Sequence, residues 1–105
     1  MVRRIILAIG EGAPLVKQAK RVCTEVSQIT GVEVDIIKDD WEFLYEHGER
    51  DEWGGIDLPQ IFIETDEGEI KHVMTRLPLT PDGKVDLESA KRILLEALRG
   101  ESNLS

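Results

Sequence analysis

Residues 3–9 read Arg-Arg-Ile-Ile-Leu-Ala-Ile, and this nearly continuous apolar run is typical of a strand buried on both faces. Apolar side chains then recur at helical spacing, with Pro14 in the position of a first helical turn and Gly31 placed to end the helix. Residues 32–36 alternate between apolar and acidic side chains, which indicates a second strand. Because a strand, a helix and a strand form a βαβ unit, we expect the two strands to be parallel.

The second half of the chain predicts a different set of connections. Asp39 or Asp40 can cap a short helix. The runs at residues 61–63 and 70–74 are short strands separated by a tight turn, so we expect an antiparallel hairpin. Asp86 can cap a final helix with a wide apolar stripe. The order βαβαββα predicts an α/β fold of the thioredoxin-like class, with a four-stranded mixed sheet and helices on both faces.

Length and composition bound the class of protein. The chain has 105 residues, of which 41% are apolar, enough for one modest core. Its longest apolar run, Ile5–Ile9, is too short for a membrane helix and lacks the features of a signal peptide. Cys23 is the single cysteine, which excludes a disulfide scaffold. We therefore expect a cytoplasmic protein with one domain over residues 1–100, a frayed tail at 101–105 and no membrane partner.

The net charge of -8 is concentrated in the middle of the chain. Residues 39–69 carry twelve acidic side chains and one basic side chain, Arg50. A field of this sign repels phosphate backbones and anionic lipids, so we expect no nucleic-acid partner. The acidic stretch is either a solvated face or a surface for a basic protein partner.

Two segments resemble the glutaredoxin family. Residues 13–20 read Ala-Pro-Leu-Val-Lys-Gln-Ala-Lys, which is similar to the family's Cys-Pro-Tyr-Cys-Lys-Lys-Ala-Lys pattern and lies where that pattern should, between the first strand and first helix. Residues 58–63 read Leu-Pro-Gln-Ile-Phe-Ile, which resembles the Val-Pro-Gln-Ile-Phe-Ile segment that carries the family's cis-proline. The resemblance covers essentially residues 3–99, whereas the loop at residues 49–56 has no clear counterpart.

The departure from that pattern removes the family's redox chemistry. Ala13 and Val16 occupy the positions of the two cysteines, and no serine or threonine lies between Gly10 and Lys20. Disulfide exchange needs a thiolate to attack and a thiol to leave, so we expect no catalytic residue and neither dithiol nor monothiol oxidoreductase activity. Cys23 lies too far along the helix to substitute, and it is either a small core residue or a sensor or metal-linked thiol.

The resemblance also bears on ligands. The basic residue that would grip glutathione is missing, because Glu11 and Gly12 precede Ala13, and no Gly-Gly turn follows Met74. We therefore expect no glutathione binding and no cofactor. The resemblance implies that Pro59 is cis and that the backbone beside it pairs with an extended peptide, which does not require thiols. The predicted groove comprises Gly12, Ala13, Pro14, Val16, Leu58 and Pro59.

Two other ligand classes can be weighed from the residues. Gly10 and Gly12 could begin a dinucleotide-binding fingerprint, but Leu15 occupies the third glycine position and the parallel sheet is lacking. His47 has carboxylate neighbours that could bind a metal, yet a histidine at a helix end also complements the helix dipole. We expect no metal site.

The sequence leaves alternatives open for the tryptophans and for the overall function. Trp41 is expected in the core. Trp53 lies in a loop rich in glycine and acidic residues at positions 48–57, which we call the acidic loop, and it either folds onto the core or contacts a partner. The leading hypothesis is a redox-inactive glutaredoxin-like domain, without enzymatic activity, that binds a protein or peptide through the groove. The alternative is a thiol-dependent or small-molecule-handling enzyme that uses Cys23 or the acidic loop. A homodimer through a strand edge or Trp53 is a third possibility.

Overall fold

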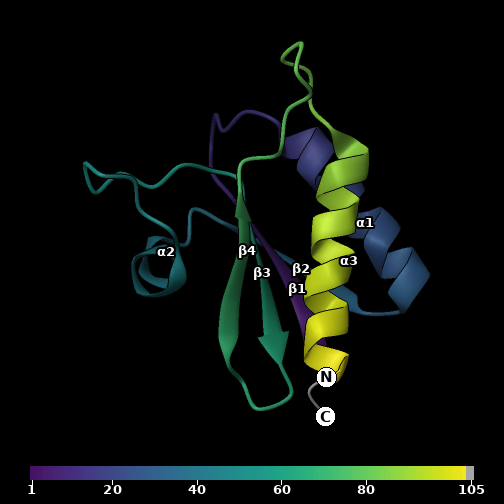
Figure 1. The fold of residues 1–105 in the computed structure, drawn as a ribbon. Helices are drawn as coiled ribbons and strands as arrows, with labels where there is room; N and C mark the ends of the chain where they lie inside the picture. Colours follow the sequence, from purple (N-terminus) through teal and green to yellow (C-terminus); the bar gives the residue numbers. More distant parts are fainter. Residues whose placement is uncertain (104–105) are drawn as a thin grey trace.

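The structure, a computed structural model, describes residues 1–103 and shows an α/β fold with one four-stranded mixed sheet (Figure 1). The strands follow the order β2-β1-β3-β4 across the sheet. Along the chain the elements are β1 (Val2–Ile9), α1 (Val16–Thr30), β2 (Glu33–Lys38), α2 (Trp41–His47), β3 (Gln60–Thr65), β4 (Ile70–Thr75) and α3 (Leu87–Asn103).

The apolar run at the start of the chain forms the central strand, as predicted. β1 runs parallel to β2 and antiparallel to β3, so that Leu7 lies between Ile36 and Ile61 in the two registers. β4 pairs antiparallel with β3 and completes the predicted hairpin. The side chains of Ile5 and Leu7 are fully buried, because helices cover the sheet on both sides.

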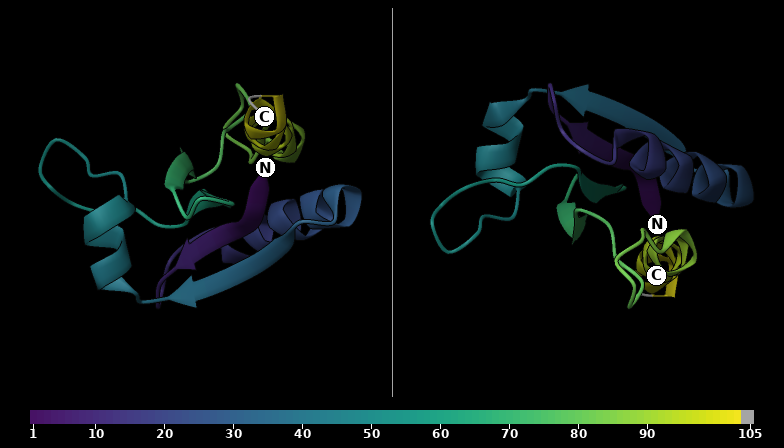
Figure 2. Two further views of the ribbon diagram at one scale, coloured as in Figure 1. Left: turned by 90° about the horizontal axis from the view of Figure 1, so that it is seen from below. Right: turned by 90° about the horizontal axis from the view of Figure 1, so that it is seen from above.

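Two apolar clusters hold the helices to the sheet. α1 and α3 pack on one face, where Ile5 and Leu7 meet Val22 of α1 and Leu94 of α3. α2 packs on the other face through Leu44, which meets Phe62 of β3 and other apolar side chains of that face. Figure 2 shows α2 on the opposite side of the sheet from α1 and α3. Successive apolar side chains of β1 and β3 point to opposite faces of the sheet, so each strand contributes to both clusters, as expected of a sheet buried on two faces.

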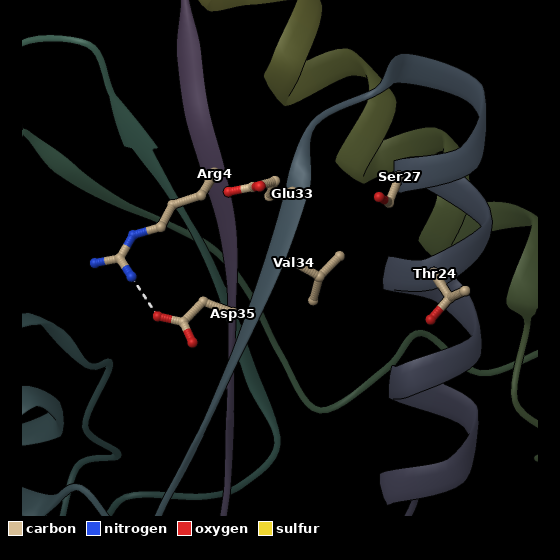
Figure 3. A pocket seen from close by; sticks show the side chains of 6 residues that line it. All are labelled: Arg4, Thr24, Ser27, Glu33, Val34 and Asp35. Carbon is tan, nitrogen blue, oxygen red and sulfur yellow. Dashed lines mark hydrogen bonds and ion pairs between the residues drawn. The ribbon is translucent and has the colours of Figure 1, made fainter.

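Beyond α2, the same sheet face carries a row of charges. Arg4 Nε donates to Glu64 Oε1 at 2.6 Å, and Arg4 Nη1 donates to Asp35 Oδ2. This one guanidinium therefore bridges the carboxylates of two strands that flank β1. Figure 3 shows the contact between Arg4 and Asp35. A hollow of about 640 Å³ beside it, at the β2 edge, is open and polar.

The helix ends agree with the predicted signals at three points and differ at one. Gly31 ends α1 in the left-handed conformation, Asp40 accepts from Phe43 N–H at the start of α2, and Asp86 accepts from Ser89 N–H at the start of α3. Pro14, however, is not in the first turn of α1, which begins two residues later at Val16. The cause is Leu15, whose φ of 60° interrupts the right-handed helix.

The frayed tail predicted from residue 101 is wrong over its first part, because α3 continues to Asn103. Lys71 Nζ of β4 donates to Glu101 Oε1 at 2.6 Å and holds the last turn against the sheet. Residues 104–105 of that tail lie outside the described residues. Within residues 1–103, no helix is long and apolar enough to span a membrane.

Candidate functional site

A groove of about 390 Å³ is lined by the loop that leads into α1, the junction between β2 and α2, and the loop that leads into β3. Four of the six predicted groove residues line it, namely Gly12, Ala13, Pro14 and Leu58. The groove therefore lies at the N-terminal end of α1, and its role in binding stays a prediction. Side chains that were not predicted in the groove also line it: Glu11, Asp39, Trp41, Ile56, Asp57 and Arg76.

The other two predicted residues do not line the groove. Val16 is partly buried and packs against the core under α1. Pro59 is buried, its peptide bond with Leu58 is cis as the resemblance implies, and its carbonyl accepts from Arg76 N–H at 2.7 Å. The backbone N–H and C=O of Leu58 have no hydrogen-bond partner within residues 1–103. Leu58 therefore offers a free backbone donor and a free backbone acceptor directly before Pro59.

Unusual backbone conformations concentrate at this groove. Within the described chain, the non-glycine residues with positive φ are Leu15, Asp39 and Arg76, at 60°, 53° and 58°. Asp39 and Arg76 line the groove, and Leu15 directly follows Pro14. Such conformations cost free energy for residues with a Cβ and persist where the surroundings enforce them. Asp39 is held by two hydrogen bonds, from its N–H to Ile9 O and from Glu11 N–H to its Oδ1.

The charges around the groove are mixed. Arg76 Nη2 lies 3.8 Å from Asp57 Oδ2, and both side chains remain largely open to solvent. Asp39 and Glu11 add two more carboxylates, so Arg76 is the cation among the groove-lining residues. Arg76 follows β4 and meets the groove only through the fold, since nothing in its local sequence marks it as a site residue.

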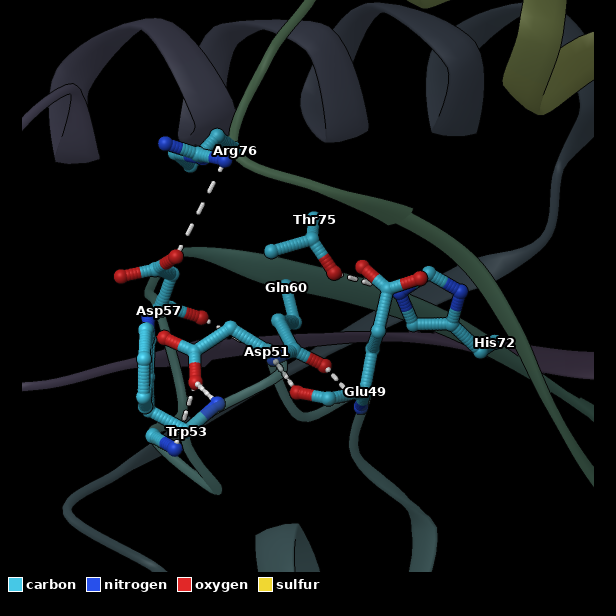
Figure 4. A network of polar contacts seen from close by, with 9 residues as sticks. Glu49, Asp51, Trp53, Asp57, Gln60, His72, Thr75 and Arg76 are labelled. Carbon is cyan, nitrogen blue, oxygen red and sulfur yellow. Dashed lines mark hydrogen bonds and ion pairs between the residues drawn. The ribbon is translucent and has the colours of Figure 1, made fainter.

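Gln60 fixes the acidic loop beside the groove, as Figure 4 shows. Its side chain is fully buried on the α2 face at the start of β3. Its Nε2 donates to Glu49 O at 2.9 Å and to Asp57 O at 3.0 Å, and its Oε1 accepts from Glu49 N–H at 2.9 Å. Both ends of the loop are therefore tied to one side chain. The family resemblance includes Gln60 only as one letter of its segment, although a polar residue in an apolar strand is itself a signal for a buried network.

Neither tryptophan is buried in the core, although the sequence allowed a core position for each. Trp53 is 87% exposed, so the alternative in which it folds onto the core is wrong, whereas its contact with a partner stays a prediction. Trp41 is 44% exposed and lines the groove, which corrects its predicted core position. The reason is the shortness of α2, whose buried contacts with the sheet are made by Phe43 and Leu44.

Cys23 lies inside the core between α1 and α3. Burial raises the pKa of its thiol to about 12, so the reactive thiolate is scarce at neutral pH. These properties favour the structural interpretation of Cys23. Residues 1–103 hold no group of three histidine, cysteine or acidic side chains arranged to bind a metal. His47 instead lies against the Phe43 ring, and His72 Nε2 is 2.7 Å from Thr75 Oγ1.

No protein-family model, curated protein or solved structure matches the chain. Function is therefore inferred from the groove and its surroundings.

Proposed function

We propose that this protein is a redox-inactive glutaredoxin-like domain that binds an extended segment of a protein or peptide in the groove. The element order and the strand order β2-β1-β3-β4 are compatible with a thioredoxin-like fold. The loop before Pro59 faces the start of α1 across the groove, as the resemblance implies. These features support a family relationship and do not depend on the missing cysteines.

The free backbone of Leu58 carries the proposal. An extended peptide can pair with an unsatisfied N–H and C=O and take its affinity from main-chain hydrogen bonds. Ala13 and Pro14 add apolar surface opposite Leu58, so the groove offers both backbone pairing and contact for side chains. A peptide bound there requires no thiol.

The enzymatic alternative has less support. Cys23 is buried in the core and separated from the groove, and its raised pKa disfavours nucleophilic attack. The acidic loop uses Asp51 to bind its own backbone, with Trp53 N–H and Gly55 N–H donating to Asp51 Oδ1. That carboxylate is therefore engaged in shaping the loop.

Peptides selected from a random display library on the wild-type protein test the proposal. We expect the substitution Ala13→Trp, which fills the groove, to weaken their binding about tenfold or more, because the peptide loses its main-chain contacts. The matched control is Glu67→Trp, at an exposed turn distant from the groove. In NMR titrations the Leu58 amide should shift and exchange more slowly when peptide is bound. Equal affinity for the wild type and Ala13→Trp would refute the proposal.

A further inference from the structure

The outer face of α2 continues the groove as an exposed aromatic surface. Trp41 lines the groove, and its ring centroid lies 6.4 Å from that of Tyr45, one helical turn further along. Trp41 is 44% exposed and Tyr45 is 58% exposed, so both side chains are open to solvent. We call Trp41 and Tyr45 the α2 aromatic face. A segment that leaves the groove past Trp41 would therefore lie directly on this face.

The surroundings of this face are strongly acidic. Residues 39–57 carry eight carboxylates and one guanidinium, and all eight carboxylate residues are exposed. Three of them, Glu42, Glu49 and Glu52, have no side-chain ion pair or hydrogen bond within residues 1–103. A partner with positive charge would find uncompensated carboxylates here, whereas an acidic partner would be repelled.

The chain already places one guanidinium on this face. Arg50 Cζ lies 5.2 Å from the centroid of the Tyr45 ring, and Arg50 Nη2 donates to Tyr45 O at 2.8 Å. Arg50 forms no ion pair with any carboxylate in the described chain, so the aromatic ring and the backbone hold it. This contact is a cation–π interaction, and it shows that the face accommodates a guanidinium. The Trp41 ring has no such cation within the described residues.

We propose that the occupant of the groove is an arginine-rich segment of a protein partner, which continues over the α2 aromatic face. This inference rests on the proposed function and specifies the chemistry of its partner. An arginine of the segment stacks on Trp41 as Arg50 stacks on Tyr45, and neighbouring basic residues face Glu42 and Glu52. Arginine is favoured over lysine because a planar guanidinium stacks on an aromatic ring and is weakly hydrated.

Three synthetic peptides of twelve residues test this proposal, identical except that four positions hold arginine, lysine or glutamate. Isothermal titration and the fluorescence of the two tryptophans report binding to the full chain. We expect the arginine peptide to bind most tightly, the lysine peptide more weakly and the glutamate peptide not at all. The double substitution of Trp41→Ala and Tyr45→Ala should weaken binding of the arginine peptide about tenfold, because the ring on which the peptide arginine stacks is lost together with its aromatic neighbour.

Matched variants separate this site from general attraction to an acidic protein. Ile29→Ala with Leu79→Ala removes two exposed apolar residues elsewhere and should leave the affinity unchanged. Glu42→Gln with Glu52→Gln should weaken binding, whereas Glu33→Gln with Glu67→Gln makes the same change of charge away from the face and should not. Circular dichroism melts confirm that each variant is folded.

The outcomes separate the two proposals. Absence of binding by the arginine peptide, or equal losses in the matched variants, overturns the arginine-rich partner. Suppose that Ala13→Trp abolishes binding of library peptides, whereas the double substitution of Trp41→Ala and Tyr45→Ala leaves peptide binding unchanged. The groove function then stands and the inference of an arginine-rich partner fails. If the aromatic variant weakens binding of the arginine peptide and Ala13→Trp does not, the groove function fails and the aromatic face remains.

Discussion

Gln60 and Glu49 form a reciprocal pair of hydrogen bonds between one side chain and one backbone residue. Glu49 N–H donates to Gln60 Oε1 and Gln60 Nε2 donates to Glu49 O, each at 2.9 Å. The amide side chain thus satisfies both backbone groups of Glu49, as a neighbouring strand would. Because Gln60 begins β3, this pair fixes the start of the acidic loop to the sheet.

Replacing Gln60 by methionine should detach the acidic loop while preserving side-chain volume. The substitution removes three partly buried hydrogen bonds and leaves backbone groups of Glu49 and Asp57 without their partner. We expect the free energy of unfolding to fall by about 1–3 kcal/mol. Urea denaturation measures this loss, and hydrogen exchange at Glu49 N–H should become much faster.

Glu49→Ala is the control for that experiment, because the two residues meet through the backbone of Glu49 rather than its carboxylate. Its stability and the exchange rate of its residue-49 amide should remain close to the wild type. Unchanged protection of Glu49 N–H in Gln60→Met would contradict the assigned network.

Arg4 should stabilise the protein through its ion pairs with the neighbouring strands, whereas Arg3 should not. Arg4→Gln leaves Glu64, which is only 15% exposed, and Asp35 facing one another without the bridging cation. We expect a loss of about 1–3 kcal/mol in the free energy of unfolding, larger at low salt because the remaining charges repel. Arg3 is exposed, so Arg3→Gln is the matched control for the loss of charge. Equal effects of the two substitutions in denaturation experiments would show that the bridge is not important.

The sequence predicted the sheet and helices well because their signals are local. β1 is an almost continuous apolar run because both of its faces are buried, and α1 has apolar residues at helical spacing because one stripe is buried. Capping residues such as Asp40 lie next to the helix that they begin. The groove loop from Gly12 to Pro14 was located for a related reason, since the turn after a strand must lie at the start of the next helix.

The remaining groove residues could not be predicted because only the fold brings them together. Arg76 follows β4 and Asp39 follows β2, yet both line the groove with a positive φ. Arginine is not a residue that signals this conformation, so no sequence pattern marked the turn. Trp41 was misplaced because amphipathic spacing in a helix of seven residues does not say which apolar side chains the sheet can cover.

The left-handed conformation of Arg76 predicts an unusual order of stability. Both Arg76→Gly and Arg76→Ala lose the side chain, but only alanine retains a Cβ at a φ of 58°. We expect the glycine variant to be more stable than the alanine variant by about 1 kcal/mol, measured by urea denaturation.

The same pair of substitutions at Lys20 should give the opposite order. Lys20 is exposed in the interior of α1, where alanine is favoured over glycine by about 1 kcal/mol. If alanine is also the more stable residue at position 76, the backbone of Arg76 does not adopt the left-handed conformation in solution.

The burial of Cys23 predicts a loss of stability in alkaline solution. Burial raises the pKa of the thiol from its ordinary value of 9.0 to about 12, so between these values only the unfolded chain releases the proton. The stabilisation is complete below pH 9.0 and is lost as the pH rises toward 12. The slope contributed by this group is at most about 1.4 kcal/mol per pH unit.

Other groups also titrate in this range, so the contribution of Cys23 is the difference between the wild type and Cys23→Ala in urea denaturation from pH 8 to about 11. We expect the wild type to lose stability more steeply than the variant above pH 9.0, with parallel curves below it. Native Cys23 should also react slowly with iodoacetamide until the chain is unfolded, because the thiolate is scarce and the side chain is covered. Parallel curves at every pH together with rapid labelling would place the thiol at the surface, and the enzymatic alternative would then regain its nucleophile.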